Sequence, residues 1–282
     1  AHLMLQQNWE HLQLIFKHTH SQPAKIESDI SRVKRVYLDG NAKNVSQLLV
    51  FSKYNHELVS TLTIEQSGNH RGLIVGKPFQ EGTLGNIEVP LCQEIHKFEC
   101  KDPADISAMR WKYFLDKIHP ALMPRTCIVV PSYYDFVRMR NHMKRAEDSF
   151  IARARDLFFH EKKSYLIVTE RYYFFNRRHL KGIHRLVFYQ LPSHPILYSE
   201  IINMSEADTK QRFLSQLLLC KSDIVRMQNV FGNTMTSAIL QNKNSIQAIV
   251  SVLIQVLTVP NVVRVRRSDG VACSRSVNWG KV

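Results

Sequence analysis

The stretch Thr126–Val130 (TCIVV) is a nearly continuous apolar run that ends at Pro131 and Ser132. A short run of this kind, without polar alternation, is typical of a strand buried on both faces of a parallel sheet. Two similar runs follow it, Tyr165–Thr169 (YLIVT) and Arg185–Tyr189 (RLVFY). The sequence therefore predicts three parallel strands in this part of the chain.

Helical segments separate these strands. Tyr134–Arg145 places Phe136, Val137 and Met143 on one side of a helix, and a second helix is expected over Ile151–His160. Strands that alternate with helices of this length form βαβ units. The predicted fold class is therefore α/β, a parallel sheet with flanking helices.

The N-terminal part of the chain carries weaker signals. Leu3–His18 and Pro103–His119 have apolar residues at helical spacing, so both are predicted to be helices. Gln47–Ser52 (QLLVFS) and Leu58–Ile64 (LVSTLTI) resemble two strands around a turn. A short strand is expected at Leu73–Val75, inside a glycine-rich loop.

The C-terminal part continues the mixed pattern. Phe213–Leu219 is either a strand or a helix, Ser222–Val230 and Thr234–Gln241 are predicted to be helices, and a last strand follows Ser245. The apolar run after Ser245 is shorter than the roughly 20 residues that cross a bilayer. We therefore expect no membrane span.

Positive charge is concentrated in two segments of this 282-residue chain. Lys and Arg number 38 against 24 Asp and Glu, a formal net charge of +14. Residues 125–185 hold 14 basic and 6 acidic residues, and residues 256–282 hold 5 and 1. Such a balance favours a polyanionic partner, either nucleic acid or an acidic membrane surface, and charge alone leaves both open.

Motifs for metal or nucleotide chemistry are missing from the sequence. The five cysteines form no C-x-x-C pair, and the thirteen histidines have no metal-site spacing. Gly72–Pro78 (GLIVGKP) is one residue short of a phosphate-binding loop and has proline where the Mg²⁺-binding hydroxyl belongs. We expect no metal and no cofactor.

Arginines interleaved with aromatic residues can hold phosphates while the rings stack on bases. The candidate RNA-binding residues are Arg138, Arg140, Lys144, Arg145, Arg153, Arg155, Arg171, Arg177, Arg178, Arg264, Arg266 and Arg267. The candidates for base stacking or for packing on a partner protein are Tyr172, Tyr173, Phe174 and Phe175. The alternative is that the arginines form a solvated face and that two of the rings face the core.

The order of these strands, helices and the basic loop between them resembles the second RecA-like domain of DEAD-box RNA helicases. The matching positions are Ser132, Arg155, Phe159, Thr169, Glu170, Tyr189, Leu191, Pro192 and Tyr198. The catalytic residues of that family do not match. Ile201 and Met204 stand where its arginine fingers would be, and Glu200 takes the place of its histidine. Bulky residues replace its Thr-Asp-x-Ala-x-Arg-Gly loop.

A narrower resemblance rests on longer strings, among them QNWEH, TERYYFFNRR and KGIHRLVFYQLP. They are similar to the digestive-organ expansion factor family, the U3 small nucleolar RNA-associated proteins of the small-subunit processome. The resemblance implies a degenerate helicase. Residues 1–100 would be the C-terminal part of a first RecA-like domain, 101–124 a connecting helix, 125–255 the second domain and 256–282 a basic tail. The segment from Arg145 to Phe150 is shorter than in a usual RecA-like domain.

The resemblance implies a non-catalytic nucleolar ribosome-assembly factor that is associated with the U3 particle and needed for pre-18S rRNA processing. Its expected partners are pre-rRNA, small nucleolar RNA and small-subunit processome proteins, which it would bind as a scaffold. Two alternatives remain open. One is an active ATP-dependent RNA helicase whose first domain lies upstream, and the other is a purely protein-binding module.

Overall fold

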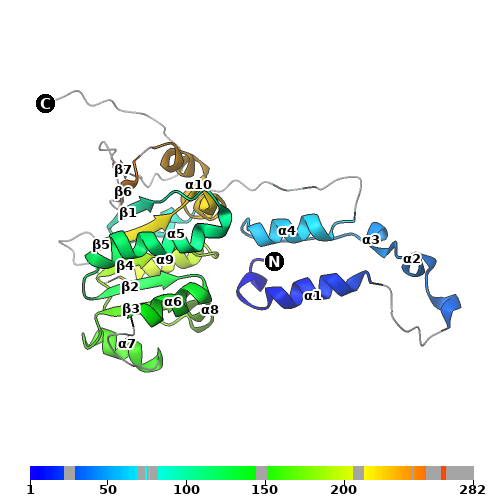
Figure 1. Ribbon diagram of the computed structural model, residues 1–282, viewed down its shortest axis with the longest axis horizontal. Coiled ribbons are helices and arrows are strands. Elements are labelled where there is room, and N and C mark those ends of the chain that lie inside the picture. The colour runs from blue at the N-terminus through cyan, green and yellow to red at the C-terminus, as the bar shows by residue number, and fades with distance from the viewer. Residues whose placement is uncertain are drawn as a thin grey trace.

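A seven-stranded sheet lies on one side of the molecule, and the helices of the N-terminal segment extend away from it (Figure 1). The computed structural model describes residues 1–21, 29–68, 74, 76, 82–143, 151–205, 213–242, 244–251 and 262–264. The strands are β1 (Leu91–Lys97), β2 (Thr126–Val130), β3 (Tyr165–Thr169), β4 (Arg185–Phe188), β5 (Phe213–Leu219), β6 (Ile246–Ser251) and β7 (Val262–Arg264). Their order is β3-β2-β4-β5-β1-β6-β7, and only the β1–β6 pair is antiparallel. The expected parallel α/β sheet is confirmed.

The described α-helices lie on both faces of the sheet and in an N-terminal arm. They are α1 (Trp9–Thr19), α2 (Arg35–Leu38), α3 (Ala42–Val45), α4 (Glu57–Gln66), α5 (Ile106–Tyr113), α6 (Tyr133–Met143), α7 (Ile151–Phe159), α8 (Glu170–Asn176), α9 (Ile196–Asn203) and α10 (Ile224–Gln241). A π-helical turn, Phe114–Ile118, continues α5. Figure 1 shows α1 to α4 beside the sheet and extending away from it. Within the described residues, no helix is long and apolar enough to cross a membrane.

Side chains of the parallel strands alternate between two hydrophobic clusters. In β2, Cys127 and Val129 belong to a cluster that includes residues of α7, α8, α9 and α10. Ile128 and Val130 belong to the other, which includes residues of the α5 region and α6. Every residue of β2 is buried, because helices cover both faces of the sheet. This packing explains why β2 has no polar alternation.

The structure corrects some of the other sequence expectations and decides between the alternatives in one. Leu58–Ile64 lies in helix α4 rather than in a strand, and Gln47–Ser52 has no regular secondary structure. The two helices expected within 222–241 form α10, which is broken at Gly232 (φ 76°, ψ 171°). The strand expected at Leu73–Val75 lies outside the described residues except for Ile74. Phe213–Leu219 is a strand.

Strand β1 was not expected, and it lies between β5 and β6. Its sequence (LCQEIHK) includes polar residues, and several of their groups have hydrogen-bond partners within the fold. Gln93 is fully buried and accepts a hydrogen bond from the Tyr198 hydroxyl, and Glu94 accepts one of 2.9 Å from Gln216 Nε2. The sequence division placed these residues in the 1–100 segment, yet they belong to the same sheet as β2 to β5.

The break in α10 allows the helix to form a hydrogen bond with the loop that precedes β1. Because Gly232 leaves the helical conformation, the carbonyl of Val230 is available to accept a 2.8 Å hydrogen bond from the Thr83 amide. Gly82 precedes this contact with φ +81°, and a Cβ atom there would lie 2.5 Å from the Val230 oxygen. Glycine at position 82 is therefore required by both conformation and space.

Candidate nucleic-acid interface at the strand ends

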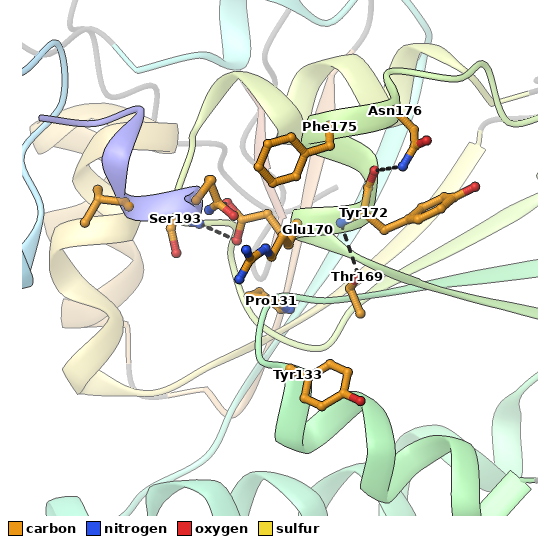
Figure 2. Close-up of a pocket in the computed structure, with 11 residues that line it drawn as sticks. Pro131, Tyr133, Thr169, Glu170, Tyr172, Phe175, Asn176 and Ser193 are labelled. Carbon is orange, nitrogen blue, oxygen red and sulfur yellow. Dashed lines mark hydrogen bonds between the residues drawn. The ribbon is translucent and has the colours of Figure 1, made fainter. Parts of the chain in front are cut away.

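The carboxyl ends of β2, β3 and β4 meet at one edge of the sheet, because these strands are parallel neighbours. A pocket of about 500 Å³ opens there. Its lining residues are Leu5, Gln6, Pro131, Tyr133, Thr169, Glu170, Arg171, Tyr172, Phe175, Asn176 and Ser193. The N-terminal segment therefore contributes to a pocket that is otherwise built from the strand ends, α6 and α8 (Figure 2).

The aromatic run after β3 forms helix α8, whereas the sequence suggested a loop. Thr169 caps the helix, because its Oγ1 accepts a 3.2 Å hydrogen bond from the Tyr172 amide. The rings consequently point in different directions. Tyr173 is buried, Tyr172 and Phe174 are partly buried against the core, and Phe175 is 53% exposed.

Glu170 is a buried carboxylate in the first turn of α8, with 1% of its surface exposed. It accepts hydrogen bonds from Gln6 Nε2 (2.7 Å), the Ser193 amide (3.0 Å) and the His194 amide (2.9 Å). Burial raises the pKa of this carboxyl, while the two backbone amides and Arg226 act in the opposite direction. The carboxylate thus joins three separate segments at the strand ends.

Arg177 is the C-cap residue of α8 and adopts the left-handed conformation (φ 45°). Its side chain contacts other residues of the protein. Its guanidinium forms an ion pair with Glu200 of α9 and lies 5.3 Å from the ring centroid of Phe174. Burial, followed by the Glu200 charge, raises the pKa of Tyr173 to about 12. Arg177 is therefore already engaged in contacts within the protein.

The other candidate arginines differ in how they are placed. Arg138 is exposed on α6 and lies 3.8 Å from Asp135, and Arg140 of the same helix is also exposed. Arg171 is exposed, with its guanidinium 5.8 Å from the Phe175 ring centroid, and Arg178 is exposed after α8. Three of these exposed candidates therefore lie on α6 and α8, the two helices that contribute to the pocket, and Arg178 follows α8.

Arg155 of α7 is partly buried. Four other candidates, Lys144, Arg145, Arg266 and Arg267, lie outside the described residues, and so do the side chains of Arg153 and Arg264.

Sequence reasoning missed two kinds of residue at this edge. Tyr133 and Tyr134 begin α6 with 68% and 85% of their surfaces exposed, and Tyr133 lines the pocket. Two adjacent aromatic residues directly after a buried strand were an available signal. Gln6 and Glu170 gave no such signal, because 164 residues separate them. Within the described part of the chain, no three His, Cys, Asp or Glu residues are grouped as a metal site would require.

Two family models together match most of the chain. The model described as "Utp25, C-terminal domain" matches residues 83–249, and "UTP25, NTP hydrolase-like domain" matches residues 1–74.

Curated relatives are called U3 small nucleolar RNA-associated protein 25 or its homolog. The chain is 31% identical to the Xenopus tropicalis protein over 89% of its length, 32% to the Homo sapiens protein over 86%, and 29% to the Pyricularia oryzae protein over 86%. The chain spans 35% to 38% of the length of these relatives.

Two solved structures, one of them of a DEAD-box protein, are also similar. S. cerevisiae Dbp5 bound to RNA and ADP BeF3 matches with a TM-score of 0.38 and 14% identity, covering 70% of this chain and 52% of that one. E. coli SrmB bound to regulator of ribonuclease activity A matches with a TM-score of 0.35 and 13% identity, covering 48% of this chain and 84% of that one.

Proposed function

Because the chain belongs to the Utp25 family, we propose that it acts as a non-catalytic ribosome-assembly factor of the small-subunit processome in the nucleolus. Its relatives carry the name U3 small nucleolar RNA-associated protein. The partners that we propose are pre-rRNA, small nucleolar RNA and processome proteins. In this role the protein is an RNA- and protein-binding scaffold that supports pre-18S rRNA processing.

One observation carries the RNA-binding part of the proposal, namely the exposed arginines on α6, on α8 and directly after α8. Arg138 and Arg140 lie on α6, Arg171 lines the pocket, and Arg178 follows α8. Exposed guanidinium groups bind phosphates and release counterions, which gives salt-dependent affinity for RNA. The lining contains one acidic residue among those described, Glu170, and its carboxylate is buried against three donors.

The proposal that the protein is non-catalytic is supported by the residues at the positions that match helicase arginines. Ile201 is fully buried and Met204 is half-buried, so neither position offers a cation to a nucleotide. Glu200 forms its ion pair with Arg177. Transfer of a phosphoryl group needs positive charge at the transferred phosphate, and these positions supply none.

The competing function is that of an ATP-dependent RNA helicase, which is favoured by the match of residues 1–74 to an NTP hydrolase-like domain. The test measures ATP turnover by the full-length protein with and without single-stranded RNA. RNA binding is measured in the same samples. We expect RNA binding without ATP turnover. Turnover that RNA stimulates would support the helicase, and absence of RNA binding would favour the protein-binding module.

A further inference from the structure

We propose that the pocket at the strand ends binds one unpaired nucleotide of single-stranded RNA, with its base against Tyr133 and Phe175 and its phosphate beside Arg171. The inference rests on the proposed function, because it assigns a ligand to the same RNA-binding face. It adds that this face holds a base as well as the RNA backbone.

Two exposed rings border the pocket from different helices. Tyr133 comes from the start of α6 and Phe175 from the end of α8, with 68% and 53% of their surfaces exposed. Figure 2 shows them on opposite sides of the pocket, with Pro131 and Thr169 between them. Each ring can stack on a base, because every base has an aromatic face.

The size and lining of the pocket suit a nucleotide. Its volume of about 500 Å³ falls in the range of roughly 300 to 1,000 Å³ that small-molecule sites occupy. Its lining also includes the polar residues Thr169, Asn176 and Ser193. A flat apolar face with a polar edge, as in a nucleobase, matches this combination of rings and polar groups.

The charges favour RNA over a peptide as the occupant. Arg171 lines the pocket, and Arg138 and Arg140 are exposed on the helix that Tyr133 begins. The carboxylate of Glu170, the acidic group of the described lining, faces its own hydrogen-bond donors. A phosphate linked to the bound base therefore meets positive charge.

The test measures binding of the full chain to a short single-stranded RNA that contains the fluorescent base 2-aminopurine, whose emission falls when it stacks on a ring. The variants are Tyr133→Ala and Phe175→Ala, with the conservative variants Tyr133→Phe and Phe175→Tyr as rescues. The matched control is Tyr134→Ala, since Tyr134 is the adjacent, more exposed ring and does not line the pocket. Thermal unfolding of each variant verifies that it is folded.

We expect RNA to quench the probe on the wild-type protein, and Tyr133→Ala and Phe175→Ala each to weaken binding at least about fivefold. The rescues and Tyr134→Ala should stay within about twofold of the wild type, below the loss expected from removing one stacking ring. Wild-type RNA affinity in both alanine variants would overturn the pocket proposal and leave the RNA-binding function standing. No RNA binding by the wild-type protein would overturn both. Loss of protein partners instead of RNA in these variants would assign the pocket to a peptide.

Discussion

The side-chain amide of Gln6 donates a 2.7 Å hydrogen bond to the carboxylate of Glu170, and both residues are buried. The bond joins the N-terminal segment to the first turn of α8. The same carboxylate also accepts hydrogen bonds from the backbone amides of Ser193 and His194, which follow β4. The shape of the pocket therefore depends on a contact between parts of the chain that match two different family models.

Replacing Glu170 by alanine should be strongly destabilising. The substitution leaves two buried donors and one partly buried donor without their acceptor, so we expect the free energy of unfolding to fall by about 3 to 5 kcal/mol. Gln6→Ala removes one of the three bonds and should cost about 1 kcal/mol. Urea unfolding measures both values. The control is Gln7→Ala at the adjacent exposed residue, and equal effects of Gln6→Ala and Gln7→Ala would contradict the assigned role of Gln6.

The stability contributed by two buried histidines should fall as the pH decreases from 6.5 towards 4. Burial lowers the pKa of His56 and of His194 from 6.5 to about 4. Across this window the unfolded chain binds protons that the folded chain does not, so each histidine contributes stability above pH 6.5 that is lost towards pH 4. The imidazole of His56 must also stay neutral to accept its 3.1 Å hydrogen bond from the Leu58 amide.

The variant His194→Phe isolates one of these groups. It preserves an aromatic ring beside Tyr54 and Phe174, whose ring centroids lie 5.3 and 5.7 Å from that of His194. Urea unfolding across the pH window should show a smaller loss of stability than in the wild type. His11→Phe, at an exposed position of α1, serves as the control. An unchanged pH dependence in His194→Phe would refute the assignment.

The ion pair between Arg110 of α5 and Asp223 should be essential to the fold. Its atoms lie 2.7 Å apart and each side chain is 3% exposed. Asp223→Ala leaves a buried guanidinium without its partner, so we expect a loss of about 3 to 5 kcal/mol in the free energy of unfolding. Asp39→Ala breaks an exposed pair with Arg35 and should change stability by less than about 1 kcal/mol. Similar losses in the two variants would count against this account.

Gly82 should not tolerate a side chain. Gly82→Ala places a Cβ atom 2.5 Å from the Val230 oxygen at a φ of +81°, so we expect a loss of about 2 kcal/mol or more. The matched variant is Gly85→Ala, where no atom lies within 4 Å of the added carbon, and its stability should stay near the wild-type value. Thermal unfolding compares the two. A Gly82→Ala protein as stable as Gly85→Ala would mean that the contact with α10 is dispensable.

Secondary structure was predicted correctly from the sequence where the local pattern of apolar residues matches the burial of those residues in the fold. Strands β2 and β3 were predicted at their observed residues because apolar side chains fill both faces of the sheet. Strand β1 was missed because Gln93 is buried by a partner, Tyr198, that is distant in sequence. Helix α4 was predicted as a strand because Val59, Thr61, Thr63 and Ile64 are β-branched, a preference that the packing of the arm overrides.

Part of the candidate site could be predicted from the sequence, because some of its residues are neighbours in the chain. The rings and arginines of α8 are contiguous in the sequence, so their composition marked them as candidates. Which ring is exposed depends on the helix, and Tyr133 joins Phe175 at the pocket only when β2 and β3 are paired. The Gln6–Glu170 contact is non-local, so a single sequence without its fold carries no trace of it.

The central claim is that exposed arginines of α6 and α8 bind RNA phosphates. The most direct measurement is the slope of log K against log salt concentration for binding of single-stranded RNA. It is compared between the wild-type chain and the triple variant Arg138→Ala, Arg140→Ala, Arg171→Ala. Each phosphate contact that is lost should reduce the slope by about 0.7, so we predict a reduction of about 2. The control variant, Arg32→Ala with Arg35→Ala, removes two exposed arginines of the N-terminal arm and should preserve the wild-type slope. A triple variant that keeps the wild-type slope would contradict the claim.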